Sequence, residues 1–348
     1  EDGIRDVERS RGLGDVYKRQ NNSYTYPPLF HSLSLIPALL GLPPIDAVRI
    51  TGILIYLTLP IAVYLLISNY TQNKISKILS ILLTGLSPLL LNIFLMGEFP
   101  ELLGILFFIL TLHTIKAKKH LLTPVFSALA LLSHPFFGPL STLLFLFNIR
   151  DIPRRDLLPS LIIFLSLSSI WLPRYIQIAD NAITGKWHNR INDEYQPVFW
   201  FWKPEEIAEY LFGINHLTLP FLLLSIIGLL KTNDTLLRYL FIIFLFFSLF
   251  HIPGTQLKPI DTLSVISIPI SVIGIESLSR KAKSIPPPFI TLSIIFLLFT
   301  IQILHIDYAK KNWLLERETP PEDLIHATEW LKNYDAKFVR IVSPAAPE

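Results

Sequence analysis

The sequence predicts an all-α, polytopic integral membrane protein with about ten transmembrane helices. Hydrophobic residues make up 51% of the 348 residues and charged residues only 16%, against about 25% charged in ordinary soluble domains. Leu, Ile and Phe recur in nearly uncharged blocks of roughly 17–22 residues, the length that a helix needs to cross about 30 Å of hydrocarbon. A soluble core could not bury so much apolar surface, so we expect lipid to surround the chain.

The first twenty residues differ from the rest. Glu1 to Gln20 are polar and charged, and the composition changes abruptly at Asn21. No apolar stretch follows the basic residues, which excludes a signal peptide. The run RSRGLGDVYKRQ resembles translated sequencing-adapter sequence. We therefore expect residues 1–20 to be non-native, with a preceding helix and loop missing; a short basic cytoplasmic tail is the alternative.

The transmembrane domain is predicted over residues 21–306 and opens with a short helix. The run Tyr24 to His31 (YTYPPLFH) leads into an apolar stretch that ends at Leu42. This stretch of about 14 residues is too short to span comfortably. We predict a juxtamembrane helix over 28–42 at the outer interface, with Pro28 in its first turn.

The following segments are predicted to span the membrane: 47–68, 76–96, 98–115, 121–133, 136–148, 157–174, 214–231, 236–252, 260–278 and 287–306. Two of them, 121–133 and 136–148, are short for full crossings. They form either a re-entrant hairpin that turns at His134 and Pro135 or a pair of tilted helices buried by their neighbours.

Basic residues predict the orientation. Alternate connections carry Lys74 and Lys77; Lys116, Lys118 and Lys119; Arg150, Arg154 and Arg155; Lys231 and Arg238; and Arg280, Lys281 and Lys283. The positive-inside rule makes these loops cytoplasmic and places the outer loop 174–214 and the chain after Ile306 outside the cell membrane. The glycosylation sequons at Asn69 and Asn233 fall in cytoplasmic loops, so we interpret them as chance matches.

The last segment changes character. Residues 318–342 (ETPPEDLIHATEWLKNYDAKFVRIV) are typical of a capped amphipathic helix followed by a strand that begins near Lys337. We expect residues 307–348 to be the start of a truncated extracytoplasmic α/β domain.

Composition excludes several function classes. The chain contains no cysteine, so thiolate catalysis and cysteine-based metal sites are excluded. Its formal charge of +3 is too small, and too scattered between apolar blocks, to indicate nucleic-acid binding. The expected partner is membrane lipid.

Two carboxylates near the outer face are the strongest candidates for catalysis. Glu98 and Glu101 lie three residues apart in the turn Gly97-Glu98-Phe99-Pro100-Glu101. Acids at the membrane edge are candidates for function. They could take a proton from an acceptor hydroxyl, or bind a divalent cation such as Mg or Mn that neutralises a phosphate. The alternative is that both merely cap the following helix.

His134 lies in the run Leu132-Ser133-His134-Pro135-Phe136 at the predicted hairpin turn. Its imidazole could bind a phosphate or move a proton. The commoner explanation is that it satisfies carbonyls freed by Pro135.

The long outer loop supplies further candidates for binding. Trp187, His188, Arg190, Asp193 and Glu194 combine an aromatic ring for stacking on a sugar with a guanidinium for phosphate. For these residues the sequence favours neither a sugar and phosphate site nor an interfacial aromatic belt. Trp200 and Trp202 are better explained by an interfacial aromatic belt.

Together these elements resemble the GT-C superfamily of membrane glycosyltransferases. The resemblance is carried by Tyr-Pro-Pro-Leu-Phe-His, Gly-Glu-Phe-Pro-Glu, Leu-Leu-Ser-His-Pro, the long aromatic loop and a final Glu-Trp-Leu. The nearest branch is a group of archaeal and bacterial membrane proteins, some labelled as related to 6-pyruvoyl-tetrahydropterin synthase. That label is misleading here, because a soluble pterin enzyme cannot share this composition.

The resemblance implies transfer of a sugar from a polyprenyl-phosphate carrier to an acceptor at the outer membrane face. In that superfamily the catalytic Asp lies upstream of the Pro-Pro-Leu element, where we expect this chain to have lost its native residues, so we assign none. Tyr26, Pro27, Pro28 and His31 are assigned to the juxtamembrane element. Glu98 and Glu101 are assigned to the acidic outer turn. A transporter and a non-catalytic membrane scaffold remain the alternatives.

Overall fold

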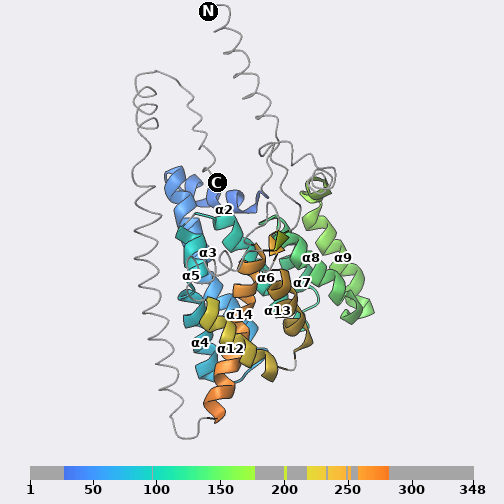
Figure 1. Cartoon of the computed structure of the whole chain (residues 1–348). Coiled ribbons are helices and arrows are strands. Elements are labelled where there is room, and N and C mark those ends of the chain that lie inside the picture. The colour runs from blue at the N-terminus through green and yellow to red at the C-terminus, as the bar shows by residue number, and fades with distance from the viewer. Residues whose placement is uncertain are drawn as a thin grey trace, which may run out of the picture. The chain divides into compact units, whose positions relative to one another are not determined.

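The computed structural model describes residues 27–95, 97–176, 200–201, 218–232, 234–247, 250–251 and 258–281. The chain divides into two compact units, Glu1–Leu298 and Phe299–Glu348, and every described residue belongs to the first. This part is mostly helical (Figure 1).

The helices are α2 (Leu29–Leu39), α3 (Pro44–Ile67), α4 (Lys74–Gly85), α5 (Pro88–Leu95), α6 (Phe99–Lys116), α7 (Leu122–Leu131), α8 (Phe137–Asn148), α9 (Arg154–Ser168), α12 (Thr218–Lys231), α13 (Thr235–Phe247) and α14 (Lys258–Lys281). A 3₁₀ turn, η1 (Ile149–Asp151), follows α8. Two-residue strands, β1 (Trp200–Phe201) and β2 (Phe250–His251), pair antiparallel, with Trp200 opposite His251.

The helical character predicted from the sequence is confirmed. Among the described residues, α3 and α6 are each long and apolar enough to cross a membrane. The bent pair α4–α5 makes a third if it counts as one span. Most of the remaining predicted crossings coincide with shorter helices. The crossing 260–278 coincides with α14, of which only the part Thr262–Leu278 counts as a shorter apolar helix. The crossing 287–306 lies outside the described residues. The predicted α/β domain lies outside them too.

The segment 76–96, predicted as one continuous span, is broken. α4 and α5 are bent by 43°, and the break immediately precedes Pro88, which lacks an N–H and disfavours helical geometry in Ser87. The Tyr56 hydroxyl donates to the Gly85 carbonyl at 2.9 Å. This bond satisfies a carbonyl at the end of α4.

α6 is the centre of the structure. It packs against α3, α7 and α8, and its buried residues, among them Leu102, Ile105, Phe108 and Leu112, lie on all its faces. A helix that is apolar all round is buried by its neighbours. α3 differs, because Leu54, Leu57 and Ile61 are more than half exposed, as expected of a face turned to lipid.

α12 and α14 approach each other closely through small residues. A Cβ on Gly228 would lie 1.9 Å from the Ile270 carbonyl oxygen, and one on Gly274 would lie 2.3 Å from that of Leu224. The buried Ser225 hydroxyl bonds the Ser271 hydroxyl at 2.9 Å. Small residues and shared hydroxyl bonds are how helices associate tightly in lipid.

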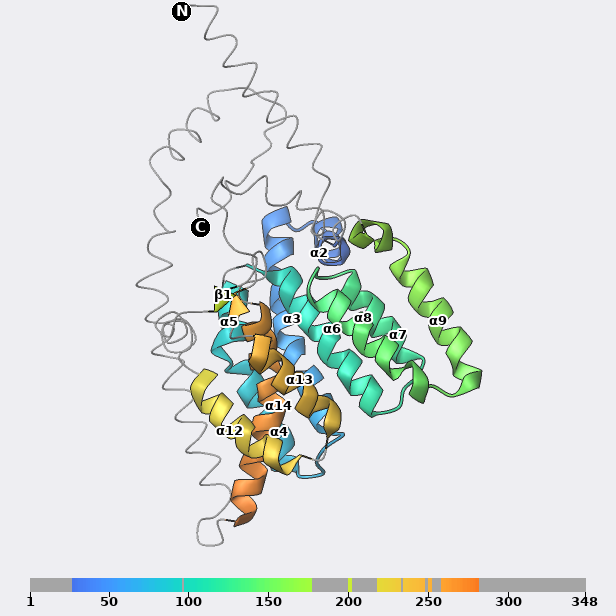
Figure 2. The ribbon, with the colours of Figure 1, turned by 45° about the vertical axis from the view of Figure 1, so that its right-hand side comes forward.

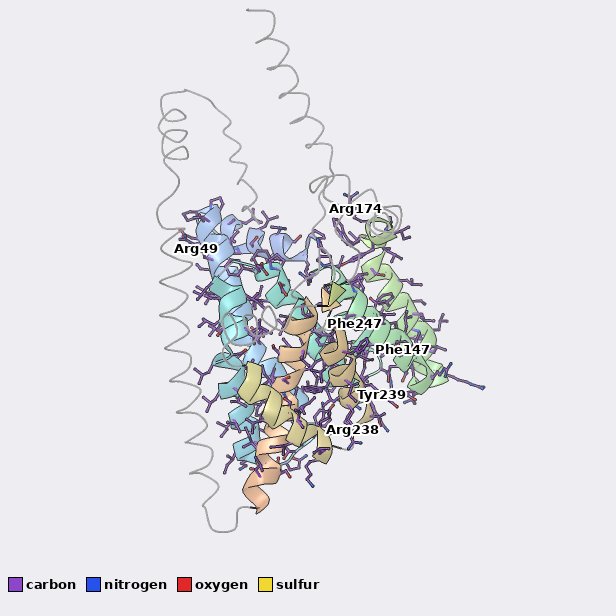
Figure 3. All side chains as sticks on the ribbon, viewed as in Figure 1. Arg49, Phe147, Arg174, Arg238, Tyr239 and Phe247 are labelled. Carbon is purple, nitrogen blue, oxygen red and sulfur yellow. The ribbon has the colours of Figure 1, made fainter. Side chains whose placement is uncertain are left out.

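Polar and charged side chains lie at both ends of the helix bundle (Figure 3). α2 lies at one end of the bundle, beside the start of α3 (Figure 1 and Figure 2), and Arg49 and Arg174 lie at that end (Figure 3). Arg238 lies at the opposite end (Figure 3). At that opposite end Lys116 pairs with Asp234 at 2.5 Å, and the Asn69 amide lies 2.9 Å from His113 Nδ1. We call these the α2 end and the Lys116 end; the sequence predicts that the α2 end faces outside.

Candidate functional site

Three motifs that are far apart in the sequence meet at the α2 end. The Leu29 amide donates to the Leu132 carbonyl at 3.0 Å. The Phe30 and Phe99 rings lie 5.7 Å apart. A Cβ on Gly104 would lie 2.6 Å from the Cβ of His134. Segments 27–31, 97–104 and 131–137 therefore form one cluster, which we call the Glu101 site.

The acidic turn is shaped by Gly97. This residue has φ +76°, a left-handed conformation that favours glycine, and it turns the chain from α5 into α6. Glu98 is the N-cap residue of α6, and its carbonyl accepts from the Glu101 amide at 3.0 Å. Its carboxylate, which is half-buried, makes no capping bond to α6. One interpretation expected both acids to cap α6, but the Glu98 side chain makes no such bond.

Glu101 is the buried acid of the site. It lies in the first turn of α6 and is 1% exposed. A carboxylate is rarely buried to this extent, because its charged form loses hydration. The partial positive charge of the helix N-terminus attracts a carboxylate at this position. Burial next to a polar turn makes Glu101 the stronger candidate of the two acids.

His134 is 1% exposed and lies three residues before the start of α8. Its Nδ1 accepts from the Phe136 amide at 3.2 Å and lies 3.5 Å from the Phe137 amide nitrogen. Through Nδ1 the ring thus accepts from backbone amides at the start of α8, and the expectation that the imidazole satisfies freed carbonyls stays a prediction. Because Nδ1 accepts, the neutral ring carries its proton on Nε2.

The turn that carries His134 lies below the N-terminal end of α6. His134 packs on Gly104, which is five residues into α6, or about 7.5 Å along a helix axis. The first turn of α2, with the buried Phe30, covers it. The turn is thus recessed within the bundle.

Pro135 removes a donor from this turn. In a continuous helix the Leu131 carbonyl would accept from the amide of residue 135, but proline has none. The Tyr175 hydroxyl lies 2.9 Å from the Leu131 carbonyl oxygen and 3.0 Å from that of His134. The single phenol proton serves one of them at a time. Tyr175 thus supplies the missing donor.

Tyr175 was not identified from the sequence. The signal was present, because Pro135 implies an unsatisfied carbonyl four residues earlier. Nothing in the sequence, however, indicates which distant side chain reaches it. Burial raises the pKa of Tyr175 above its ordinary value, so the phenol stays protonated as a donor.

The remaining candidates are placed as follows. His31 is exposed on α2, and its ring lies 5.6 Å from that of Phe30. Pro27 is buried and Pro28 half-buried beside it. Six predicted binding residues lie outside the described residues: Tyr26, Trp187, His188, Arg190, Asp193 and Glu194.

The proposed divalent cation has no complete ligand set in the described part of the chain. No group of three or more His, Asp or Glu side chains there could hold a metal ion. Glu98 and Glu101 would need further ligands.

Comparison with known proteins adds no assignment: neither the protein-family models nor the curated protein sequences contain a match to this chain.

Proposed function

We propose that this protein is a GT-C-type glycosyltransferase that moves a sugar from a polyprenyl-phosphate carrier to an acceptor at the outer membrane face. The observation that carries the proposal is the buried Glu101 carboxylate in the first turn of α6, beside the recessed turn of His134. A buried acid at one end of a membrane bundle suits proton abstraction from an acceptor hydroxyl.

The backbone around Glu101 supports binding of an anionic carrier. α2, α6 and α8 all begin at this site, at Leu29, Phe99 and Phe137. Helix N-termini carry partial positive charge and favour phosphate groups. In the proposed reaction this field stabilises the phosphate as negative charge develops on it.

The proposed step is a single displacement. The acceptor oxygen attacks the anomeric carbon of the sugar, and the bond between that carbon and the phosphate oxygen breaks. The bonding electrons stay on the polyprenyl phosphate, and the acceptor proton passes to a carboxylate. Glu101 is the proposed base, and the half-buried Glu98 is the second candidate for this role.

The test uses membranes that contain the full chain and a panel of radiolabelled undecaprenyl-phosphate hexoses. Released undecaprenyl phosphate and label in the acceptor fraction are both measured. We expect Glu101→Gln, which is nearly isosteric, to lower transfer by a factor of about 10² or more at an unchanged protein level. Glu98→Gln then shows whether the second acid contributes.

Asp46 provides the matched control. It is also an acid in the first turn of a helix at the α2 end, but it is partly exposed and lies 3.9 Å from Arg49. The Asp46→Asn variant should transfer sugar as fast as the wild type. Full activity in the double variant Glu98→Gln, Glu101→Gln would remove both acids from the mechanism.

A transporter is the second candidate, because one observation favours it. The bend of 43° between α4 and α5 resembles the discontinuous helices at transporter binding sites. However, residues 82–91 around the break include no ionisable side chain. Uptake of a substrate into proteoliposomes that requires an ion gradient would favour this class over a glycosyltransferase. Wild-type behaviour after removal of every acid at the α2 end would favour a scaffold.

A further inference from the structure

The turn between α7 and α8 obtains its hydrogen bonds from two distant parts of the chain. The Leu132 carbonyl accepts from the Leu29 amide, and the Leu131 carbonyl accepts from the Tyr175 hydroxyl. The Phe136 amide, which would otherwise serve Leu132, donates to His134 Nδ1. Hydrogen bonds from α2 and from Tyr175 therefore hold the turn in this conformation.

Tyr175 reaches the turn because α8 carries a glycine there. A Cβ on Gly138 would lie 3.0 Å from the Tyr175 hydroxyl oxygen and 2.5 Å from the Leu131 Cα. The phenol thus sits where α7 and α8 come closest, next to the carbonyl that Pro135 leaves without a donor.

From this geometry we propose that Tyr175 is a positioning residue of the Glu101 site, which fixes the His134 turn against α6. This inference rests on the proposed function. The imidazole is tied to the backbone of the turn through Nδ1, and the turn packs on Gly104, one helical turn from Glu101. Loss of the Tyr175 hydroxyl leaves the Leu131 carbonyl without its donor, so the turn relaxes and the spacing between His134 and α6 changes.

A positioning role predicts a specific kinetic effect. Small displacements of groups around a reacting centre cost up to about 10² in rate while substrate binding changes little. We expect Tyr175→Phe, which keeps the ring, to lower kcat by about tenfold to a hundredfold. The KM for the undecaprenyl-phosphate hexose should stay within about twofold of wild type.

Tyr56 supplies a matched control. Its hydroxyl also donates to a backbone carbonyl at a helix break, that of Gly85, at 2.9 Å. Tyr56→Phe therefore removes the same kind of bond at a different break. It should leave both kcat and KM unchanged. An equal loss of kcat in both variants, or a wild-type kcat in Tyr175→Phe, overturns the proposal.

A second readout does not depend on catalysis. Hydrogen exchange of the amides in residues 133–138, measured in membranes or nanodiscs, should become faster in Tyr175→Phe and stay unchanged in Tyr56→Phe. Unchanged exchange in Tyr175→Phe overturns the inference. If the wild type transfers no sugar, the proposed function fails, and the exchange measurement still decides whether Tyr175 holds the turn. Suppose instead that the wild type transfers sugar and Glu101→Gln does not. A wild-type kcat in Tyr175→Phe then overturns this inference and leaves the proposed function standing.

Discussion

Gly104 of α6 packs so closely against His134 that a Cβ at position 104 would lie 2.6 Å from the His134 Cβ and 3.2 Å from that of Phe137. The absence of a side chain at this one position allows the turn between α7 and α8 to approach the helix that carries Glu101. This contact joins the acidic turn and the histidine turn, which are separated by more than thirty residues in the sequence.

Gly104→Ala tests this contact directly. The added methyl group pushes the His134 turn away, and such overpacking typically costs about 1–3 kcal/mol. We expect a lower midpoint of thermal unfolding in detergent. Gly85→Ala is the control, because its new Cβ would meet nothing closer than 3.8 Å. That variant should be neutral or slightly more stable, since alanine favours helix. Equal midpoints for the two variants would contradict the close approach.

Buried serines provide a second test. Ser127 is fully buried, and within the described part of the chain its hydroxyl has no hydrogen-bond partner. Ser225 is equally buried but bonds both the Ser267 carbonyl and the Ser271 hydroxyl. A buried hydroxyl without a partner costs about 1–3 kcal/mol. Ser127→Ala should therefore raise the thermal midpoint and Ser225→Ala should lower it; the reverse order would count against this hydrogen-bond assignment.

Stability should fall at alkaline pH. Burial raises the pKa of Tyr175, and burial together with the Asp234 carboxylate raises that of Tyr70. An unfolded tyrosine titrates near pH 10, so below that pH both states hold the proton. Above about pH 10 the unfolded state releases protons that the folded state keeps, and the free energy of unfolding decreases as pH rises further.

Tyrosine variants check that sign. Tyr70→Phe and Tyr175→Phe should each weaken the alkaline loss of stability, measured as the fall in thermal midpoint from pH 8 to pH 11. Tyr239, which is 62% exposed, is the control. The thermal midpoint of Tyr239→Phe should fall between pH 8 and pH 11 by as much as that of the wild type. An equally large fall in Tyr70→Phe would show that Tyr70 does not contribute to the alkaline loss of stability.

The ion pair at the Lys116 end links α6 to the connection before α13. Lys116 Nζ lies 2.5 Å from an Asp234 carboxylate oxygen, and the two side chains are 26% and 8% exposed. Lys116→Met leaves the mostly buried carboxylate without its cation. We expect a loss between the roughly 1 kcal/mol of an exposed pair and the roughly 3 kcal/mol of a buried one.

Asp234→Asn separates charge from capping at the same position. Asp234 Oδ1 accepts from the Leu237 amide at 2.9 Å at the start of α13, and asparagine caps equally well. The double variant Lys116→Met, Asp234→Asn should therefore recover part of the stability lost in Lys116→Met, as read from thermal unfolding. A purely additive double variant would show that the two charges do not interact.

Much of the secondary structure could be predicted because apolar block length and proline position are local properties. Every predicted helix from 28–42 to 260–278 has a counterpart, and the acidic turn does begin α6. The break between α4 and α5 was missed, although Pro88 signals it, because an apolar block conceals an interruption of only two residues. Apolar block length does not translate directly into a number of crossings, because several of the helices are shorter than a bilayer is thick.

Amino-acid order alone thus determined that this is a helical chain rich in apolar segments, with acids, a histidine and aromatic residues at the ends of those segments. It could not determine that Glu101, His134 and the start of α2 share one site, or that Tyr175 satisfies the Leu131 carbonyl. Those relationships depend on how closely α6, α7 and α8 pack. Packing at that distance is decided by side-chain volumes and by backbone donors from distant segments, which only the tertiary structure brings together.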